Sequence, residues 1–385
     1  MNGDRPTNPF NFGDLALDAS FTDRETELAE LSADIRNGQN VVIFAPRRYG
    51  KSSLLWRAAQ LVEHEGVLVA QLDLMRAASK EQFAAKLAQA IHEQIATPLL
   101  NVREKALQIF RGLRVAPTMT LDPISGAVSF SFSAGYSSDE IDTTIERLLT
   151  LPGELGAERG RRVALVFDEF QQVLDIDRRL PALMRAVFQE QPEVAHIYLG
   201  SKRSMMARLF NDENEPFWRS AKQLELGVIV PEAFAPFIKE RFQSTGRSLD
   251  EVTLGKVLEI TRGHPYATQE LCYALWEQSV PGVSVDMDDL TEALNQVLRA
   301  EHAHFTQIWD RASNVQRQAL QALAVDPPQA FFSSDYARRH RLPSRASLQR
   351  AINKLVDDEL VDREGPGRYR IAEPFLDEWI RRYGS

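Results

Sequence analysis

The chain has 385 residues, of which 44% are hydrophobic and 26% charged, and its formal net charge is −9. This length suggests two or three domains, and the composition is typical of a soluble globular protein. The acidic balance argues against a protein that coats nucleic acid along its whole length, but it allows a local basic patch.

Membrane segments and disulfides are not expected. The longest apolar runs are far shorter than the roughly 20 residues that a membrane helix needs, and the polar stretch Met1–Gly13 has no signal-peptide core. Cys272 is the one cysteine, so an internal disulfide is excluded and a reducing compartment is favoured. We therefore expect a cytoplasmic protein without membrane contact, in which Cys272 is buried.

The first 230 residues alternate between helical and strand patterns. Phe21–Ile35 is predicted to be a helix, because Leu28, Leu31 and Ile35 recur at helical spacing. Such alternation predicts an α/β fold with a parallel five-stranded sheet covered by helices on both faces. The predicted strands are residues 40–45, 66–74, 162–168, 194–201 and 223–228, and the helices between them include 52–64, 79–99 and 141–151.

Two departures from this alternation indicate the domain organisation. Residues 118–135 alternate like a hairpin around turn residues 122–126, which predicts an insertion in the sheet domain. After about residue 232 only helices are predicted, and the last stretch reads as three helices and a short hairpin. The predicted domains are an α/β core at 1–231 with its insertion at 118–135, a helical domain at 232–300 and a winged helix-turn-helix domain at 301–385.

A phosphate-binding loop is predicted between the first strand and the next helix. The pattern is G-x-x-x-x-G-K-[ST], with Ala45 where the first glycine is usual. Backbone N–H groups at the helix N-terminus would bind an anion, Lys51 would reach the β- and γ-phosphates, and Ser52 would hold Mg²⁺. The residues expected to bind ATP here are Ala45, Pro46, Arg47, Arg48, Tyr49, Gly50, Lys51, Ser52 and Ser53.

The strand at 162–168 ends in two carboxylates, Asp168 and Glu169. Ligands bind at the carboxyl ends of strands in open parallel sheets. Asp168 is therefore expected to hold Mg²⁺, and Glu169 to polarise the attacking water as a general base. Such a pair is typical of the P-loop branch that has an extra strand between the phosphate-loop strand and the acidic strand. The competing interpretation is an N-terminal cap for the next helix.

Several motifs together resemble one family. They are residues 8–10 and 21–25 before the loop, residues 47–52 in it, Gly200-Ser201 at a strand end, and 263–266 at a helix start. The chain resembles the archaeal-type ATPases of the AAA+/STAND group, which also occur widely in bacteria. The resemblance implies an ATPase core, a small helical lid and often a C-terminal winged helix.

The resemblance also implies roles for residues outside the phosphate loop. Phe21 and Arg24 match the segment that packs near the adenine, and Pro265 matches the lid proline that contacts the base. Ser201 stands where the group has a polar sensor, and so joins Lys51 and Glu169 as a catalytic residue. Arg219 lies where related ATPases present an arginine to a neighbouring γ-phosphate, although a surface role is the competing interpretation.

The C-terminal pattern is that of a winged helix-turn-helix, with a turn cluster at 364–367 suited to a wing. Exposed residues of its third helix, 344–359, are the candidates for docking in a major groove. A winged helix that binds a protein or packs on the lid is the alternative. The DNA-binding candidates are Arg345, Gln349, Arg350 and Asn353.

The sequence thus predicts an ATPase that binds ATP and Mg²⁺ and couples its nucleotide state to a lid and a winged helix, with DNA as a candidate ligand. The alternative is a slowly hydrolysing, nucleotide-gated switch or scaffold that binds a protein partner and no DNA. Homo-oligomerisation is compatible with both.

Overall fold

The computed structural model describes residues 7–13, 21–100, 108–122, 127–133, 135–328 and 330–384. The described chain forms two compact units. The sheet unit comprises Arg24–Arg47 and Lys51–Leu226, and the lid–wing unit comprises residues up to Asp23, Arg48–Gly50 and residues from Gly227 onward.

The sheet unit is built on a five-stranded sheet in the order β2-β5-β6-β1-β7, and every neighbouring pair is parallel. β6 lies between β1, which precedes the phosphate loop, and β5, which ends in Asp168. This is the strand insertion that the Asp168–Glu169 pair predicts, and the α/β fold class is confirmed. The strands are β1 (Val41–Phe44), β2 (Leu68–Asp73), β5 (Val163–Asp168), β6 (Val194–Gly200) and β7 (Lys222–Glu225).

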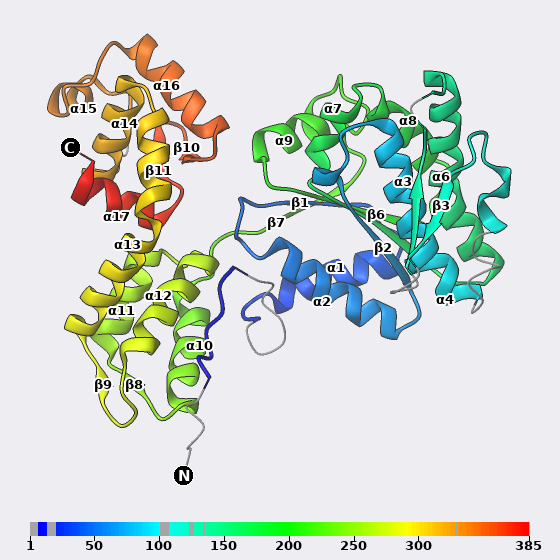
Figure 1. Ribbon diagram of the computed structural model, residues 1–385. Coiled ribbons are helices and arrows are strands. Elements are labelled where there is room, and N and C mark those ends of the chain that lie inside the picture. The colour runs from blue at the N-terminus through cyan, green and yellow to red at the C-terminus, as the bar shows by residue number, and fades with distance from the viewer. Residues whose placement is uncertain are drawn as a thin grey trace. The chain divides into compact units, whose positions relative to one another are not determined.

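Helices cover both faces of the sheet (Figure 1). The central strands β1 and β6 are buried at every position, because alternate residues face opposite helix layers. Val42 and Phe44 belong to the core on the side of α3, α6 and α8, and α1 and α2 lie on the other side. The helices are α1 (Glu25–Arg36), α2 (Lys51–His64), α3 (Lys80–Ala90), α4 (Thr97–Leu100), α6 (Ser138–Glu158), α7 (Val173–Ile176), α8 (Leu180–Phe188) and α9 (Arg203–Asn211).

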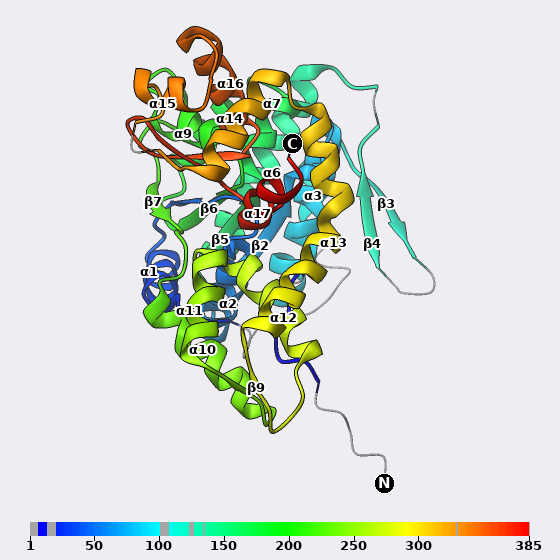
Figure 2. The same ribbon diagram turned by 90° about the vertical axis from the view of Figure 1, so that its left-hand side faces the viewer.

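One detail near the start of this unit differs from the prediction, and another lies partly outside the described residues. α1 begins at Glu25 and not at Phe21, because Asp23 has a left-handed φ of 46° and interrupts the helix before it. The insertion forms the antiparallel hairpin β3 (Thr118–Leu121) and β4 (Val128–Ser131), which projects from the unit in Figure 2. Residues 123–126 of the predicted turn lie outside the described residues.

The lid contains helices α10 to α13, as the absence of long strand patterns predicts. The expectation of helices alone is wrong in one detail, because β8 (Ser248–Leu249) and β9 (Ser284–Val285) pair in parallel. Two-residue strands leave no recognisable alternation in a sequence. The helices are α10 (Pro231–Ser244), α11 (Glu251–Thr261), α12 (Pro265–Gln278) and α13 (Met287–Arg311).

The winged helix contains one more helix than the sequence predicts. α17 follows the wing hairpin and packs on α13 and α14. α13 runs without a break across the predicted boundary at residue 300, and one hydrophobic core extends from Phe234 in the lid to Trp379 in α17. The elements are α14 (Asn314–Val325), α15 (Ser334–Arg339), α16 (Arg345–Asp357), β10 (Val361–Gly365), β11 (Arg368–Ile371) and α17 (Pro374–Tyr383).

Candidate nucleotide site

The loop after β1 turns sharply and leads into the first turn of α2. Lys51 is the first residue of α2 and is 7% exposed, and its Nζ donates to the carbonyl oxygens of Ala45 (2.9 Å) and Pro46 (2.8 Å). Gly50 has a φ of 84°, which favours glycine. The first N–H groups of α2 have no partner within the helix and point to its N-terminal end, where an anion is favoured. Ser52 and Ser53 belong to the same helical turn.

The carboxyl ends of neighbouring strands bring acidic groups together at the edge of the sheet. Asp168 ends β5, and in the parallel register it lies opposite Asp73, which ends β2. Phe44, the last residue of β1, lies opposite Gly200, the last residue of β6. The loop after β1, the Asp168–Glu169 pair and Ser201 therefore follow strand ends on one edge of the sheet.

Glu169 is oriented by its own backbone and by a neighbouring strand. Its φ of 52° is left-handed, and its backbone N–H donates to Asp168 Oδ1 at 2.9 Å. Ser201, directly after β6, donates its Oγ proton to Glu169 Oε2 at 2.7 Å. The structure thus brings together Glu169 and Ser201, two of the three residues predicted to be catalytic.

The charges around Asp168 fit a divalent cation. Burial raises the pKa of Asp168, the Glu169 N–H lowers it, the charges of Glu169 and Asp73 raise it, and the charge of Lys51 lowers it. A cation would relieve the repulsion among these carboxylates. Among the described residues, no three His, Cys, Asp or Glu side chains form a metal cage. Mg²⁺ bound to nucleotide needs none, because one or two carboxylates, waters and phosphates complete its shell.

The lid motif around Pro265 is shaped by a glycine and a capping histidine. Gly263 has a φ of 68°, and a Cβ there would collide with the carbonyl of Ile229. His264 is the N-cap of α12 and its Nδ1 accepts from the Ala267 N–H at 3.2 Å, so it starts the helix. Burial lowers the pKa of His264 to about 3. Pro265 is the first residue of α12.

Three residues of the predicted phosphate loop, Arg48 to Gly50, belong to the lid–wing unit. The Arg48 guanidinium lies 4.1 Å from the ring centre of Tyr266 in this unit, and Arg48 also pairs with Glu373 at 4.0 Å. The ring of Tyr49 meets the edge of His264, with 4.7 Å between ring centres. Their predicted contact with nucleotide stays a prediction.

The motifs before the loop lie in different parts of the structure. Phe10 is buried in the lid core, 5.2 Å from Phe242 between ring centres, and Asn8 donates to the Tyr273 carbonyl. Arg24 is buried and pairs with Glu27 at 2.8 Å, at the start of α1. Phe21 is half-buried. Because Asn8 and Phe10 contact residues of the lid, we assign the Asn8–Phe10 motif a packing role there.

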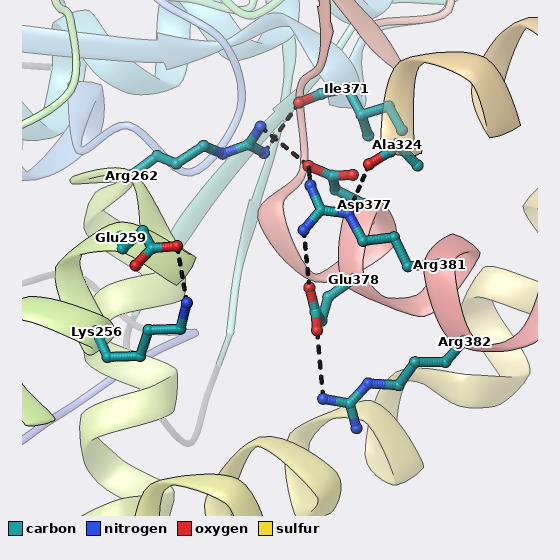
Figure 3. Close-up of polar contacts among 9 residues, drawn as sticks. All are labelled: Lys256, Glu259, Arg262, Ala324, Ile371, Asp377, Glu378, Arg381 and Arg382. Carbon is teal, nitrogen blue, oxygen red and sulfur yellow. Dashed lines mark hydrogen bonds and ion pairs between the residues drawn. The ribbon is translucent and has the colours of Figure 1, made fainter. Parts of the chain in front are cut away.

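A network of charged side chains joins the lid to α17 (Figure 3). Arg262, at the C-terminal end of α11, donates to the Ile371 carbonyl at 3.0 Å and to Asp377 Oδ2 at 3.4 Å. Arg381 also donates to Asp377. A cavity of about 420 Å³ lies beside this network, lined by residues of α11, α13 and α17 that include Lys256.

The remaining predicted residues lie at surfaces or in cores. Arg345, Arg350 and Asn353 are exposed on α16, and Gln349 is half-buried and donates to Asn353 at 2.8 Å. Arg219 is exposed beside Trp218 and has a φ of 49°. Cys272 is buried as expected. No helix among the described residues has the length and apolar character to cross a bilayer.

Asp73, Gln171 and Arg262 were missed by the sequence prediction. Asp73 could have been found, because it ends an apolar strand just as Asp168 does. Gln171, which donates from Nε2 to Glu169 Oε2, carries no signal beyond its position two residues after Glu169. Arg262 bonds to residues more than a hundred positions away, and no local pattern reports such a contact.

The sheet order, the loop after β1 and the Asp-Glu pair at the end of β5 define the fold of a P-loop ATPase. The model of a family described as an ATPase domain predominantly from Archaea matches residues 21–271, and the chain belongs to this family. A model described as a probable winged helix domain matches residues 303–382. The predicted family and winged helix are confirmed.

Solved structures resemble this chain over most of its length. A Walker-type ATPase of Pyrococcus abyssi shows the same fold over 97% of this chain and 99% of its own, with a TM-score of 0.66 and 18% identity. The Aeropyrum pernix ORC1 protein in complex with DNA covers 94% of this chain and 93% of its own, at 11% identity and a TM-score of 0.49. The match to the Thermotoga maritima RuvB Holliday junction branch migration motor covers 93% of this chain and 94% of that protein, at 12% identity and a TM-score of 0.45. A comparison with curated proteins found no match.

Proposed function

We propose that the protein binds ATP with Mg²⁺ and hydrolyses it to ADP and phosphate. The observation that carries the proposal is the meeting of Glu169 with Ser201 beside Asp168, at the strand edge from which the loop to Lys51 also departs. Lys51 and the first N–H groups of α2 bind the β- and γ-phosphates. Ser52 and Asp168 hold Mg²⁺, which neutralises phosphate charge when it is bound.

Glu169 acts as the general base in this proposal. The water oxygen attacks the γ-phosphorus while Glu169 accepts a water proton. The bond from the γ-phosphorus to its bridging oxygen breaks, and ADP leaves with the electron pair. Ser201 holds the carboxylate through the bond to Oε2.

The test is the Glu169→Gln variant, with Glu190→Gln as the control because Glu190 is exposed after α8. The amide keeps the shape of Glu169 and removes the base, so phosphate release should fall about 100-fold or more. The affinity for ATP, measured by calorimetry, should stay within about threefold. Equal phosphate release from both variants would refute Glu169 as the base.

The second candidate is a nucleotide-gated switch with very slow hydrolysis. The shared core of the lid and winged helix and the Arg262 bridge favour it, because a lid rearrangement would be transmitted to the wing. Tight ATP binding by the wild type, with phosphate release no faster than in Glu169→Gln, would favour the switch. DNA binding through α16 or capture of a protein partner is the proposed output of either function.

A further inference from the structure

The Glu169 carboxylate accepts two hydrogen bonds on one oxygen, and both donors are buried side chains. Ser201 Oγ donates to Oε2 at 2.7 Å, and Gln171 Nε2 donates to the same atom. Ser201 is 0% exposed and Gln171 is 1% exposed. The Gln171 amide thus presents an N–H group to Glu169.

Gln171 occupies a closely fitting site beside the end of β6. A Cβ at Gly200 would lie 2.6 Å from Gln171 Oε1 and would also collide with the Met206 side chain. Gln171 Oε1 is buried and meets no donor among the described residues. A buried amide oxygen without a donor costs folding free energy. This cost indicates that the amide is present for the hydrogen bond of its nitrogen to Glu169.

The backbone between the two residues supports the contact. Glu169 is left-handed, a conformation uncommon for a residue with a side chain. The Gln172 N–H donates to the Glu169 carbonyl at 2.9 Å and closes a single tight turn. The turn therefore directs the Gln171 side chain back toward the Glu169 side chain. A left-handed backbone conformation at a residue other than glycine costs energy, and such residues cluster at functional sites.

We propose that Gln171 is a positioning residue for ATP hydrolysis, which together with Ser201 holds Oε2 of Glu169 and leaves its second oxygen, Oε1, directed to the attacking water. This inference rests on the proposed function of Glu169 as the base. Two donors on Oε2 restrict the rotation of the carboxylate, and a fixed orientation speeds proton transfer. Gln171 itself touches neither water nor phosphate in this proposal.

The first measurement compares Gln171→Leu with Gln172→Leu in the full chain. Gln172 is the adjacent amide, half-buried, with its Nε2 3.6 Å from Met75 Sδ. In Gln171→Leu, kcat for ATP should fall roughly 10- to 100-fold, a part of what a positioned base contributes. KM and the calorimetric affinity for ATP should change by less than about threefold, and Gln172→Leu should match the wild type.

The second measurement separates the lost donor from lost packing. Gln171→Met keeps the approximate length and volume of the side chain but has no N–H to donate to Glu169. Its kcat should fall as far as that of Gln171→Leu, and its KM and calorimetric affinity for ATP should again stay within about threefold of the wild type.

The outcomes separate this inference from the proposed function. A wild type that releases no phosphate from ATP would refute both. A wild type that hydrolyses ATP, with Gln171→Leu equal to it in kcat, would overturn the inference alone. A fall in kcat for Gln171→Leu with the wild-type kcat in Gln171→Met would also overturn it, because that result indicates a role in packing only. If Gln171→Leu does not fold, Gln171→Met carries the measurement.

Discussion

Lys51 and Asp168 are partly buried groups of opposite charge at one end of the sheet, and each lowers the cost of burying the other. In the described structure the Lys51 ammonium bonds to carbonyl oxygens of its own loop. Phosphate oxygens carry more charge than these carbonyls and are stronger acceptors. If ATP binds as proposed, exchange of the loop carbonyls for phosphate oxygens would therefore be favourable.

We predict that Lys51→Ala weakens ATP binding by roughly 100-fold, because the variant has no ammonium group to bind the phosphates. The measurement is calorimetric titration with ATP and Mg²⁺. Lys86→Ala on α3 removes the same charge elsewhere and should bind ATP like the wild type. Equal affinity in the two variants would contradict the phosphate-loop assignment.

Glu270 in α12 gives the stability of the lid a dependence on pH. It is 5% exposed, and burial, followed by the charges of Glu301 and Glu373, raises its pKa to about 8, although Arg48 opposes the shift. The folded chain therefore holds this proton more tightly than the unfolded chain, whose pKa is near 4.5. The contribution of protonated Glu270 to the free energy of unfolding is fully present below pH 4.5 and is lost as the pH rises toward 8.

Glu270→Gln should remove this loss. The variant should exceed the wild type by about 1 to 3 kcal/mol in free energy of unfolding at pH 9, and the difference should shrink below pH 5. Denaturant unfolding at several pH values measures it. Glu240→Gln, an exposed carboxylate on α10, serves as the control. A pH-independent difference between Glu270→Gln and the wild type would contradict the assigned titration.

The lid and winged helix are joined by α13, which belongs to both, and by α17, which packs back on α13. Arg262 adds a polar connection, because its guanidinium reaches both the last residue of β11 and the first half of α17 (Figure 3). Asp377 is buried and accepts from both Arg262 and Arg381. The C-terminal end of α11, directly before the lid motif at 263–266, is thus bonded to the wing and to α17.

We predict that Arg262→Ala destabilises the lid–wing unit by about 3 kcal/mol, because Asp377 stays buried with one partner fewer. Lys256→Ala removes a cation from the same cavity but breaks only an exposed pair with Glu259, so it should cost a few tenths of a kcal/mol. Thermal unfolding compares the two, and hydrogen exchange should rise in α17 for Arg262→Ala alone. Equal stability of the two variants would show that the Arg262 bridge contributes nothing.

Considered as a whole, the chain combines a net charge of −9 with an exposed basic face on one small helix. For α16 to bind DNA, its local contacts with phosphates would have to outweigh the repulsion between DNA and the negative net charge of the chain. Such binding is strongly salt-dependent, because each neutralised phosphate releases a counterion. The dependence on salt therefore distinguishes DNA contact by α16 from capture of a protein partner.

We predict that reversal of both Arg345 and Arg350 to Glu largely abolishes duplex binding and lowers the salt slope by about two, one for each phosphate that is no longer neutralised. Fluorescence anisotropy at two salt concentrations, with and without ATP, measures this. Reversal of Arg299 and Arg311 on α13 makes the same charge change and should act weakly. Absence of wild-type binding at low salt would remove DNA as a ligand of α16.

The features that could be predicted from the sequence are those whose parts are neighbours along the chain. Gly50, Lys51 and Ser52 are consecutive, and the strand before them and the helix after them follow from local hydrophobic patterns. The same holds for Asp168 and Glu169 at the end of a buried strand. Because strand ends of a parallel sheet meet at one edge, these local patterns sufficed to predict where the site lies.

The partners of these residues depend on which strands become neighbours and in which register. Ser201 reaches Glu169 only because β6 pairs with β5, and Asp73 lies opposite Asp168 only because β2 forms the next strand. The Gln171 contact requires the left-handed turn at Glu169 and the missing side chain at Gly200 together. α17 and its bonds to Arg262 depend on packing between elements far apart in sequence, which hydrophobic periodicity does not encode.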